Sequence, residues 1–197
     1  MRALIAVAPV VALLAIPAWA VDNQPLVDRP TLWLQLGRPV AVESYWKPGN
    51  IAGALSFDLP VSRLLSLVVT AGASGGTHYH GFHGDTTELA EQHVAAGFRV
   101  TSRSRGPTRT FCWAGLAYFR AEHRVEYWLD GARYVARDST GTPGAIVGVG
   151  FLASIRGTRL CLVGELTGLL PFTQVSAGEN SYPPKQLLGV VGVRLVL

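Results

Sequence analysis

Histidines gather in one short segment of the chain, which reads THYHGFHGD. His78 and His80 are two residues apart, His83 follows them, and Asp85 ends the segment. Imidazole nitrogens and carboxylate oxygens bind zinc and copper, so these four residues are candidate metal ligands if the loop folds back on itself. Ordering a glycine-containing loop costs conformational entropy, so a solvated loop without a metal is the alternative, and we expect no cofactor.

Charged residues also occur inside segments that are otherwise apolar. They are Glu91, Arg99, Arg120, Glu165 and Arg194. Charges withdrawn from water must be paired, so we expect Glu165 to pair with Arg194 and Glu91 to pair with Arg120 as structural ion pairs. A proton or ion pathway is the alternative.

The segments that contain these charges alternate between apolar residues and small or polar residues. This period of two is typical of β-strands. For example, Leu32, Leu34 and Leu36 alternate with Trp33 and Gln35. Such segments occur at 32–37, 51–58, 65–72, 90–101, 110–120, 144–156, 158–170 and 186–197. They predict an all-β fold, an eight-stranded antiparallel up-and-down barrel.

The low content of charged residues indicates whether the predicted barrel lies in water or in a membrane. Charged residues make up 15% of the chain and hydrophobic residues 49%, and the lysines are Lys47 and Lys185. A water-soluble barrel, which stays the alternative, would present many lysines and glutamates outward. The composition therefore favours a transmembrane barrel with a polar lumen, and it excludes a disordered chain, a collagen or coiled-coil repeat and a disulfide scaffold.

The first twenty residues predict export. Arg2 precedes an apolar run, and small residues Ala18 and Ala20 end the segment, as in a secretory signal cleaved after Ala20. Residues 21–197 are then one barrel domain.

The connections between the predicted strands alternate in length. Turns near 58–63, 102–108 and 155–158 are short, whereas the loops near 43–49, 73–87, 121–143 and 171–185 are mostly longer. Short inner turns and long external loops are typical of outer-membrane barrels. Asp130-Gly131 is a hairpin signal inside the third long loop, so two strands are expected to extend above the membrane.

The chain ends in Gly192-Val193-Arg194-Leu195-Val196-Leu197. This ending resembles the C-terminal assembly signal of Gram-negative outer-membrane barrels, with Gly192, Leu195 and Leu197 at the matching positions and leucine in place of the usual last phenylalanine. Residues 21–197 as a whole resemble the small eight-stranded proteins of the OmpA-transmembrane and OmpX-like kind. The resemblance implies an outer-membrane location, periplasmic termini, and contact with outer-membrane lipids including lipopolysaccharide and with the barrel-assembly machinery.

The same resemblance implies a structural or surface-interaction role for the external loops, with an extracellular ligand or host surface as partner and no catalysis. A narrow, porin-like channel for small solutes is an alternative, and a lipid A-modifying enzyme is another. A deacylase of this kind needs a His-x-Ser pair, which the sequence lacks. The chain has no lysine or arginine run, so nucleic acid is not an expected partner.

Two further expectations concern cysteines and aromatic residues. Cys112 and Cys161 fall on the phase assigned to the lumen, in strands that are not neighbours, so we expect two buried, unpaired thiols. Aromatic residues near strand ends suggest interfacial girdles; they are Trp33, Tyr45, Trp46, Phe111, Trp113, Phe119, Tyr127, Trp128 and Tyr134.

Overall fold

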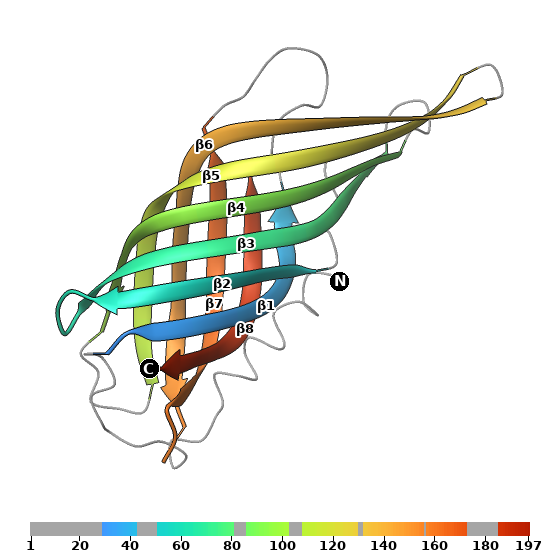
Figure 1. Cartoon of the computed structure of the whole chain (residues 1–197). Coiled ribbons are helices and arrows are strands. Elements are labelled where there is room, and N and C mark those ends of the chain that lie inside the picture. The colour runs from blue at the N-terminus through green and yellow to red at the C-terminus, as the bar shows by residue number, and fades with distance from the viewer. Residues whose placement is uncertain are drawn as a thin grey trace.

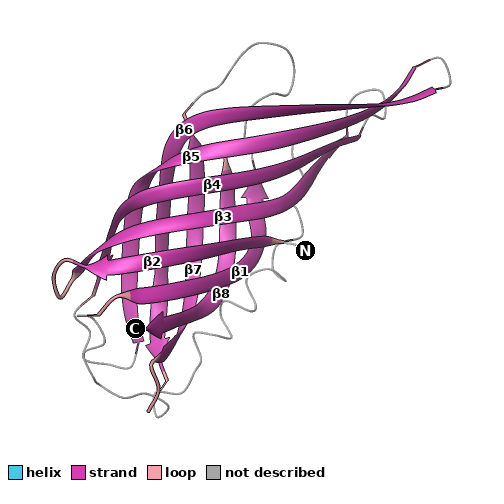
Figure 2. Cartoon of the chain, viewed as in Figure 1, coloured by secondary structure: helices cyan, strands magenta, loops and turns pink. Residues whose placement is uncertain are grey.

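The described part of the chain forms one closed antiparallel sheet. The computed structural model describes residues 29–42, 51–80, 86–102, 108–129, 132–155, 157–172 and 185–197. The eight strands are β1 (Thr31–Val42), β2 (Ala52–Pro60), β3 (Leu65–His80), β4 (Thr86–Thr101), β5 (Thr108–Leu129), β6 (Ala132–Ser154), β7 (Leu160–Pro171) and β8 (Gln186–Val196). Each strand pairs with the next, and β1 pairs with β8 to close the barrel (Figures 1 and 2). The expected eight-stranded barrel is confirmed.

The two faces of the wall differ in the way that a membrane barrel requires. On β1, Trp33 and Gln35 are buried in the lumen, whereas Leu34 and Leu36 are 53% and 59% exposed on the outer face. The same outward apolar phase recurs on the other strands, for example at Leu55, Val69, Val94, Phe98, Leu116, Val147, Val149, Leu166, Val191 and Val193. A soluble barrel would bury this face, so the apolar outer band is a surface suited to lipid. Among the described residues, no helix is long and apolar enough to cross a membrane.

The lumen is filled by side chains. Trp33, Arg99, Phe119 and Ile146 are among the largest fully buried residues, as expected for an interior only wide enough for side chains. Bulky and small residues face each other across β5 and β6. A Cβ atom on Gly144, Gly148 or Gly150 would collide with the ring of Phe119, Trp113 or Phe111, respectively. The glycines of β6 therefore provide the room that the aromatic rings of β5 occupy.

The turns at one end of the barrel are short. β6 and β7 are joined through Gly157, whose φ of 72° lies in the left-handed region that favours glycine. β2 and β3 are joined through Val61–Leu64. The expected turn at 58–63 therefore began too early, because β2 continues to Pro60 and carries Asp58 into the lumen.

Two strands are much longer than a membrane span. β5 has 22 residues and β6 has 23, whereas a tilted spanning strand needs about 9 to 11. They stay paired up to Leu129 and Ala132 and project beyond the other strands (Figure 1). The start of β1 and the end of β8, paired at Thr31 and Val196, lie at the other end of the barrel. Both strands are long enough to extend beyond a membrane span, as the sequence led us to expect.

A closed barrel of this kind should resist detergent until it is heated. After expression with its own N-terminus in a Gram-negative host, we expect the unboiled protein of the outer-membrane fraction to migrate faster in a gel than the boiled protein. A product in the soluble periplasmic fraction, with the same mobility before and after boiling, would contradict the membrane barrel.

Candidate functional site: the polar lumen and the projecting hairpin

A buried carboxylate, Glu165 on β7, is the centre of the polar interior. Its oxygens accept hydrogen bonds from Gln35 Nε2 at 2.6 Å, from Trp113 Nε1 at 2.6 Å and from Thr167 Oγ1 at 2.7 Å. These four residues, the Glu165 cluster, come from β1, β5 and β7. Three donors compensate for the water that the carboxylate has lost, so the charge is held by dipoles.

Two glycines allow these partners to reach Glu165. Gln35 and Trp113 lie on strands that are each separated from β7 by one strand. Gly148 on β6 lies between Trp113 and Glu165, and a Cβ atom there would overlap both. Gly192 on β8 faces Gln35 in the register, and its Cβ atom would overlap the carbonyl oxygen of Leu34 on β1. The cluster thus depends on the two positions in neighbouring strands that carry no side chain.

A second polar layer lies nearer the end of the barrel at which Thr31 of β1 pairs with Val196 of β8. Arg99 and Asp58 form a buried ion pair between β4 and β2. The Arg99 guanidinium lies 3.6 Å from the ring centroid of Trp33, and that of Arg194 lies 5.3 Å from the same centroid. Cation–π attraction is strongest where water is excluded, so Trp33 stabilises both cations. Thr31 Oγ1 accepts a hydrogen bond from Trp33 Nε1 at 2.9 Å, which fixes the ring.

A third polar group lies toward the opposite end. Glu91 is 1% exposed, and its Oε2 accepts a hydrogen bond from Gln186 Nε2 at 3.0 Å. His93, two residues further on, packs against the ring of Phe119 with 6.0 Å between ring centroids. Its imidazole lies over Gly72, where a Cβ atom would collide with it. These groups fill the lumen beyond the Glu165 cluster.

The structure corrects the expected ion pairs. Glu91, Arg99, Glu165 and Arg194 are all buried in the lumen, but Arg120 is on the outer face, 58% exposed, and pairs with Glu122 at 3.3 Å. Glu91 therefore bonds to Gln186 rather than Arg120, and Glu165 bonds to its three neutral donors rather than Arg194.

The reason for the error is that both phases of β5 are apolar. Phe111, Trp113 and Phe119 are buried in the lumen, and so is Trp33, so these four aromatic residues do not form an interfacial girdle. Cys112, on the opposite phase of β5, is exposed on the outer face rather than in the lumen. Cys161 is buried, and both thiols are free.

Only part of the candidate metal site lies within the described residues. The backbone of His78 and His80 belongs to β3, but the structure does not describe their side chains, and His83 and Asp85 lie outside the described residues. The described residues contain no group of three metal-binding side chains. Metal binding at these histidines stays a prediction.

The projecting hairpin is formed by the described residues 121–129 of β5 and 132–142 of β6. Glu126 on β5 bridges its two sides through an ion pair with Arg133 on β6, and it also pairs with Arg124 of its own strand at 2.7 Å. The hydrogen bond from Arg133, assisted by the two guanidinium charges, keeps the pKa of Glu126 below its usual range. The pairs are exposed, so they orient the hairpin more than they stabilise it.

One edge of this hairpin has no neighbouring strand among the described residues. β4 covers β5 as far as Glu126, but on the other side β7 ends at Pro171, opposite Gly144. The carbonyl of Pro143 accepts a hydrogen bond from the amide of Phe172, so it faces β7. Because backbone groups alternate along a strand, the amide and carbonyl groups of Arg133, Val135 and Arg137 face the same side.

Comparison of this structure with solved structures gives the same architecture. A major outer-membrane protein of Thermus thermophilus matches with a TM-score of 0.62 and 13% identity over 85% of this chain and 99% of that one. Neisserial surface protein A matches with a TM-score of 0.60 and 14% identity over 85% and 97%. The N-terminal β-barrel domain of Pseudomonas aeruginosa OprF matches with a TM-score of 0.52 and 11% identity over 86% and 98%. The fold is that of a small outer-membrane β-barrel.

No family model and no curated protein matches the sequence, so the likeness to known proteins concerns the fold. The apolar outer band and the outer-membrane origin of the matched structures together support an outer-membrane location. The cleaved signal lies outside the described residues and stays a prediction.

Sequence reasoning missed several residues of this barrel's interior. Asp58, Gln35, Gln186 and Trp113 all take part in lumen contacts. A signal for two of them was present: Gln35 alternates with Leu34 and Leu36, and Asp58 shares its phase with Ser56 in the 51–58 segment. The partners themselves come from strands far apart in the sequence.

Removing the central carboxylate should destabilise the barrel. Glu165→Ala leaves the Trp113 and Gln35 donors buried without an acceptor, at about 1–3 kcal/mol each, so we expect the free energy of unfolding to fall by about 3 kcal/mol. Urea unfolding in detergent micelles, followed by tryptophan fluorescence, measures this. The matched control is Glu122→Ala, whose exposed pair should change stability by less than about 1 kcal/mol. Equal transitions for the two variants would refute the structural role of Glu165.

A methyl group at the β1–β8 junction should impair closure. A Cβ atom on Gly192 meets the β1 backbone, whereas one on Gly189 meets side chains alone, Val40 at 3.1 Å and Leu166 at 3.9 Å. Gly192→Ala is therefore expected to reduce the fraction of folded, heat-modifiable barrel, and Gly189→Ala to leave most of it intact. Equal folded fractions in gels of the outer-membrane fraction would show that this close approach does not matter.

Proposed function

We propose that the protein is a non-catalytic surface protein of the outer membrane, which binds an extended polypeptide segment along the β6 edge of its projecting hairpin. The observation that carries the proposal is the edge of β6 at Arg133, Val135 and Arg137. These residues direct backbone donors and acceptors to a side on which the described residues provide no strand. An extended peptide can join such an edge as an additional strand.

Side chains on the same strand suit this role. Tyr134 and Val135 are 45% and 46% exposed, so apolar surface stands beside the edge. Backbone hydrogen bonds would supply affinity, and contacts with these side chains would supply selectivity. The packed interior supports a structural scaffold rather than a channel, because large side chains such as Trp33, Arg99 and Phe119 fill it.

Val135→Pro tests the edge directly. Proline removes one edge amide but is tolerated on an edge strand, so the hairpin should persist while bound peptides lose a hydrogen bond and the adjoining strand geometry. The probe is a phage-displayed library of random peptides, panned against the purified protein in micelles. We expect selected peptides to bind Val135→Pro about tenfold more weakly than the original protein, a loss of about 1.4 kcal/mol.

The matched control is Val135→Ala, which keeps the amide and should retain most of the binding. Both variants must show heat-modifiable mobility, which establishes that the barrel is folded. Selection of no peptide above the background of a variant with 121–142 replaced by a short turn would contradict the proposal. Equal affinity for the proline variant would contradict it as well.

A further inference from the structure

Arginines predominate on the face of the projecting hairpin that continues the outer wall. The register places Arg124 of β5 directly opposite Arg137 of β6, and Glu126 of β5 opposite Val135. Glu126 forms ion pairs with both Arg124 and Arg133, so one carboxylate serves two guanidinium groups. This part of the face therefore holds three arginines against one glutamate.

Arg137 is the cation of this face that lacks a carboxylate. It is exposed, and no ion pair joins it to another of the side chains that the structure describes. Like charges that lie directly opposite each other on a sheet are destabilising. A carboxylate beside Arg137 would offset its repulsion from Arg124.

The other side of the hairpin carries an acidic residue at the equivalent place. β4 lies beside β5, and its register places Glu88 directly opposite Arg124. In the opposite direction the row stops at Arg137, because β7 ends at Pro171, opposite Gly144, and the described residues add no further strand. The row thus begins with a glutamate on β4 and ends with an arginine at the β6 edge.

The residues at this edge combine backbone groups with charge. Arg133, Val135 and Arg137 direct their amides and carbonyls to the side on which the described residues provide no strand, and their side chains share the outward face. Opposite residues of paired strands have Cβ atoms about 4.5–5.5 Å apart, so an added strand brings its own side chains against all three. The two arginines are four positions apart, roughly 13 Å along the strand.

We propose that the segment which binds the β6 edge is acidic: it carries two carboxylate side chains four residues apart, opposite Arg133 and Arg137, and an apolar side chain midway, opposite Val135. Side chains of a strand alternate between its faces, so residues i, i+2 and i+4 of the segment meet this face in either strand direction. Bonds between carboxylate and guanidinium groups are charge-assisted, which makes them selective for such a segment. The inference rests on the proposed binding of peptides along this edge, and it adds the chemistry of the partner.

Two peptides of the same composition test the spacing. One contains the core Glu-Thr-Val-Thr-Glu, and the other contains Glu-Glu-Val-Thr-Thr, whose adjacent glutamates point to opposite faces, so only one can meet an arginine. Fluorescence anisotropy of labelled peptides, with the purified protein in detergent micelles, measures both affinities. We expect the first peptide to bind about threefold more tightly, a difference of about 0.7 kcal/mol, which is within the range of one cross-strand ion pair.

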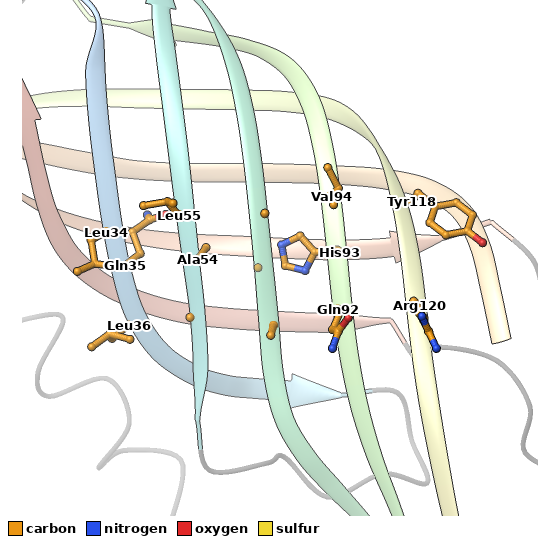
Figure 3. Close-up of a pocket in the computed structure, with 14 residues that line it drawn as sticks. Leu34, Gln35, Leu36, Ala54, Leu55, Gln92, His93, Val94, Tyr118 and Arg120 are labelled. Atoms are coloured by element: carbon orange, nitrogen blue, oxygen red, sulfur yellow. The ribbon is translucent and has the colours of Figure 1, made fainter. Parts of the chain in front are cut away.

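Arg137→Gln tests the arginine that lacks a carboxylate. One arginine then remains at the edge, so each peptide can form a single ion pair and the threefold preference should disappear. The matched control is Arg120→Gln, which removes the same charge from the outward face. Arg120 lies away from the β6 edge, beside Gln92 of β4, where it lines a groove in the outer wall between β1 and β5 (Figure 3). The control should keep the preference.

Charge reversal supplies a gain of binding. In Arg137→Glu, the new carboxylate lies opposite Arg124, so the hairpin should persist. A third peptide, in which lysine replaces the second glutamate of the first core, should bind this variant more tightly than the first peptide does. The same lysine peptide should bind the original protein more weakly than the first peptide does.

Several outcomes would overturn the inference. They are equal affinity of the first two peptides for the original protein, a preference that survives Arg137→Gln, and binding that Arg137→Gln abolishes but Val135→Pro leaves unchanged. The last result would indicate a surface for polyanions in general, which needs no edge amides. Peptides that weaken in Val135→Pro but show no preference for the acidic spacing would refute this inference and leave the proposed function standing. Heat-modifiable mobility of every variant separates these results from a failure to fold.

Discussion

The structure depends on satisfying one carboxyl group, that of Glu165, which is buried at the centre of a narrow barrel. Glu165 reaches donors on β1 and β5, neither of which is a hydrogen-bonded neighbour of β7. Backbone ladders hold each strand only to the next one, whereas these side-chain bonds tie together strands around the circumference. Gly148 on β6 and Gly192 on β8 follow from this constraint, because the bonds from Trp113 and Gln35 cross those strands at positions without a side chain.

The outer and inner faces of the wall have different requirements, and these explain which residue types occur on each face. The outer face needs only apolar area, and a few small residues there open the groove between β1 and β5. The inner face carries the specific contacts: the Glu165 cluster, the Arg99–Asp58 pair with Trp33, and Glu91 with Gln186. Substitutions that conserve hydrophobicity are therefore harmless or damaging according to the face that they alter.

The alternation of residue types was sufficient to predict the number of strands and their antiparallel order, and the Asp130-Gly131 turn signal predicted the long hairpin between β5 and β6. It was sufficient because one phase of most strands is clearly more apolar, as with Leu34 and Leu36 against Gln35. It failed for β5, where both phases are apolar and the decisive fact is the row of glycines on β6 that accepts the rings. Arg120 and Cys112 were consequently placed on the wrong face. The partners of Glu165 were out of reach of any local pattern, because they are separated from it by 130 and 52 positions.

The position of Gln35, which passes Gly192 of β8 to reach Glu165, also bears on how the barrel closes during folding. β8 is the last strand of the chain and lies between β1 and β7. Before it is inserted, the sheet is an open ribbon whose first and seventh strands have nothing to bring them within reach, and Glu165 lacks its amide donor. Pairing of the final strand therefore does two things in one event: it covers the facing edges of β1 and β7, and it gives Glu165 its amide donor. A ribbon of seven strands would lack both the pairing of β1 and β7 with β8 and the bond from Gln35, so one strand supplies both.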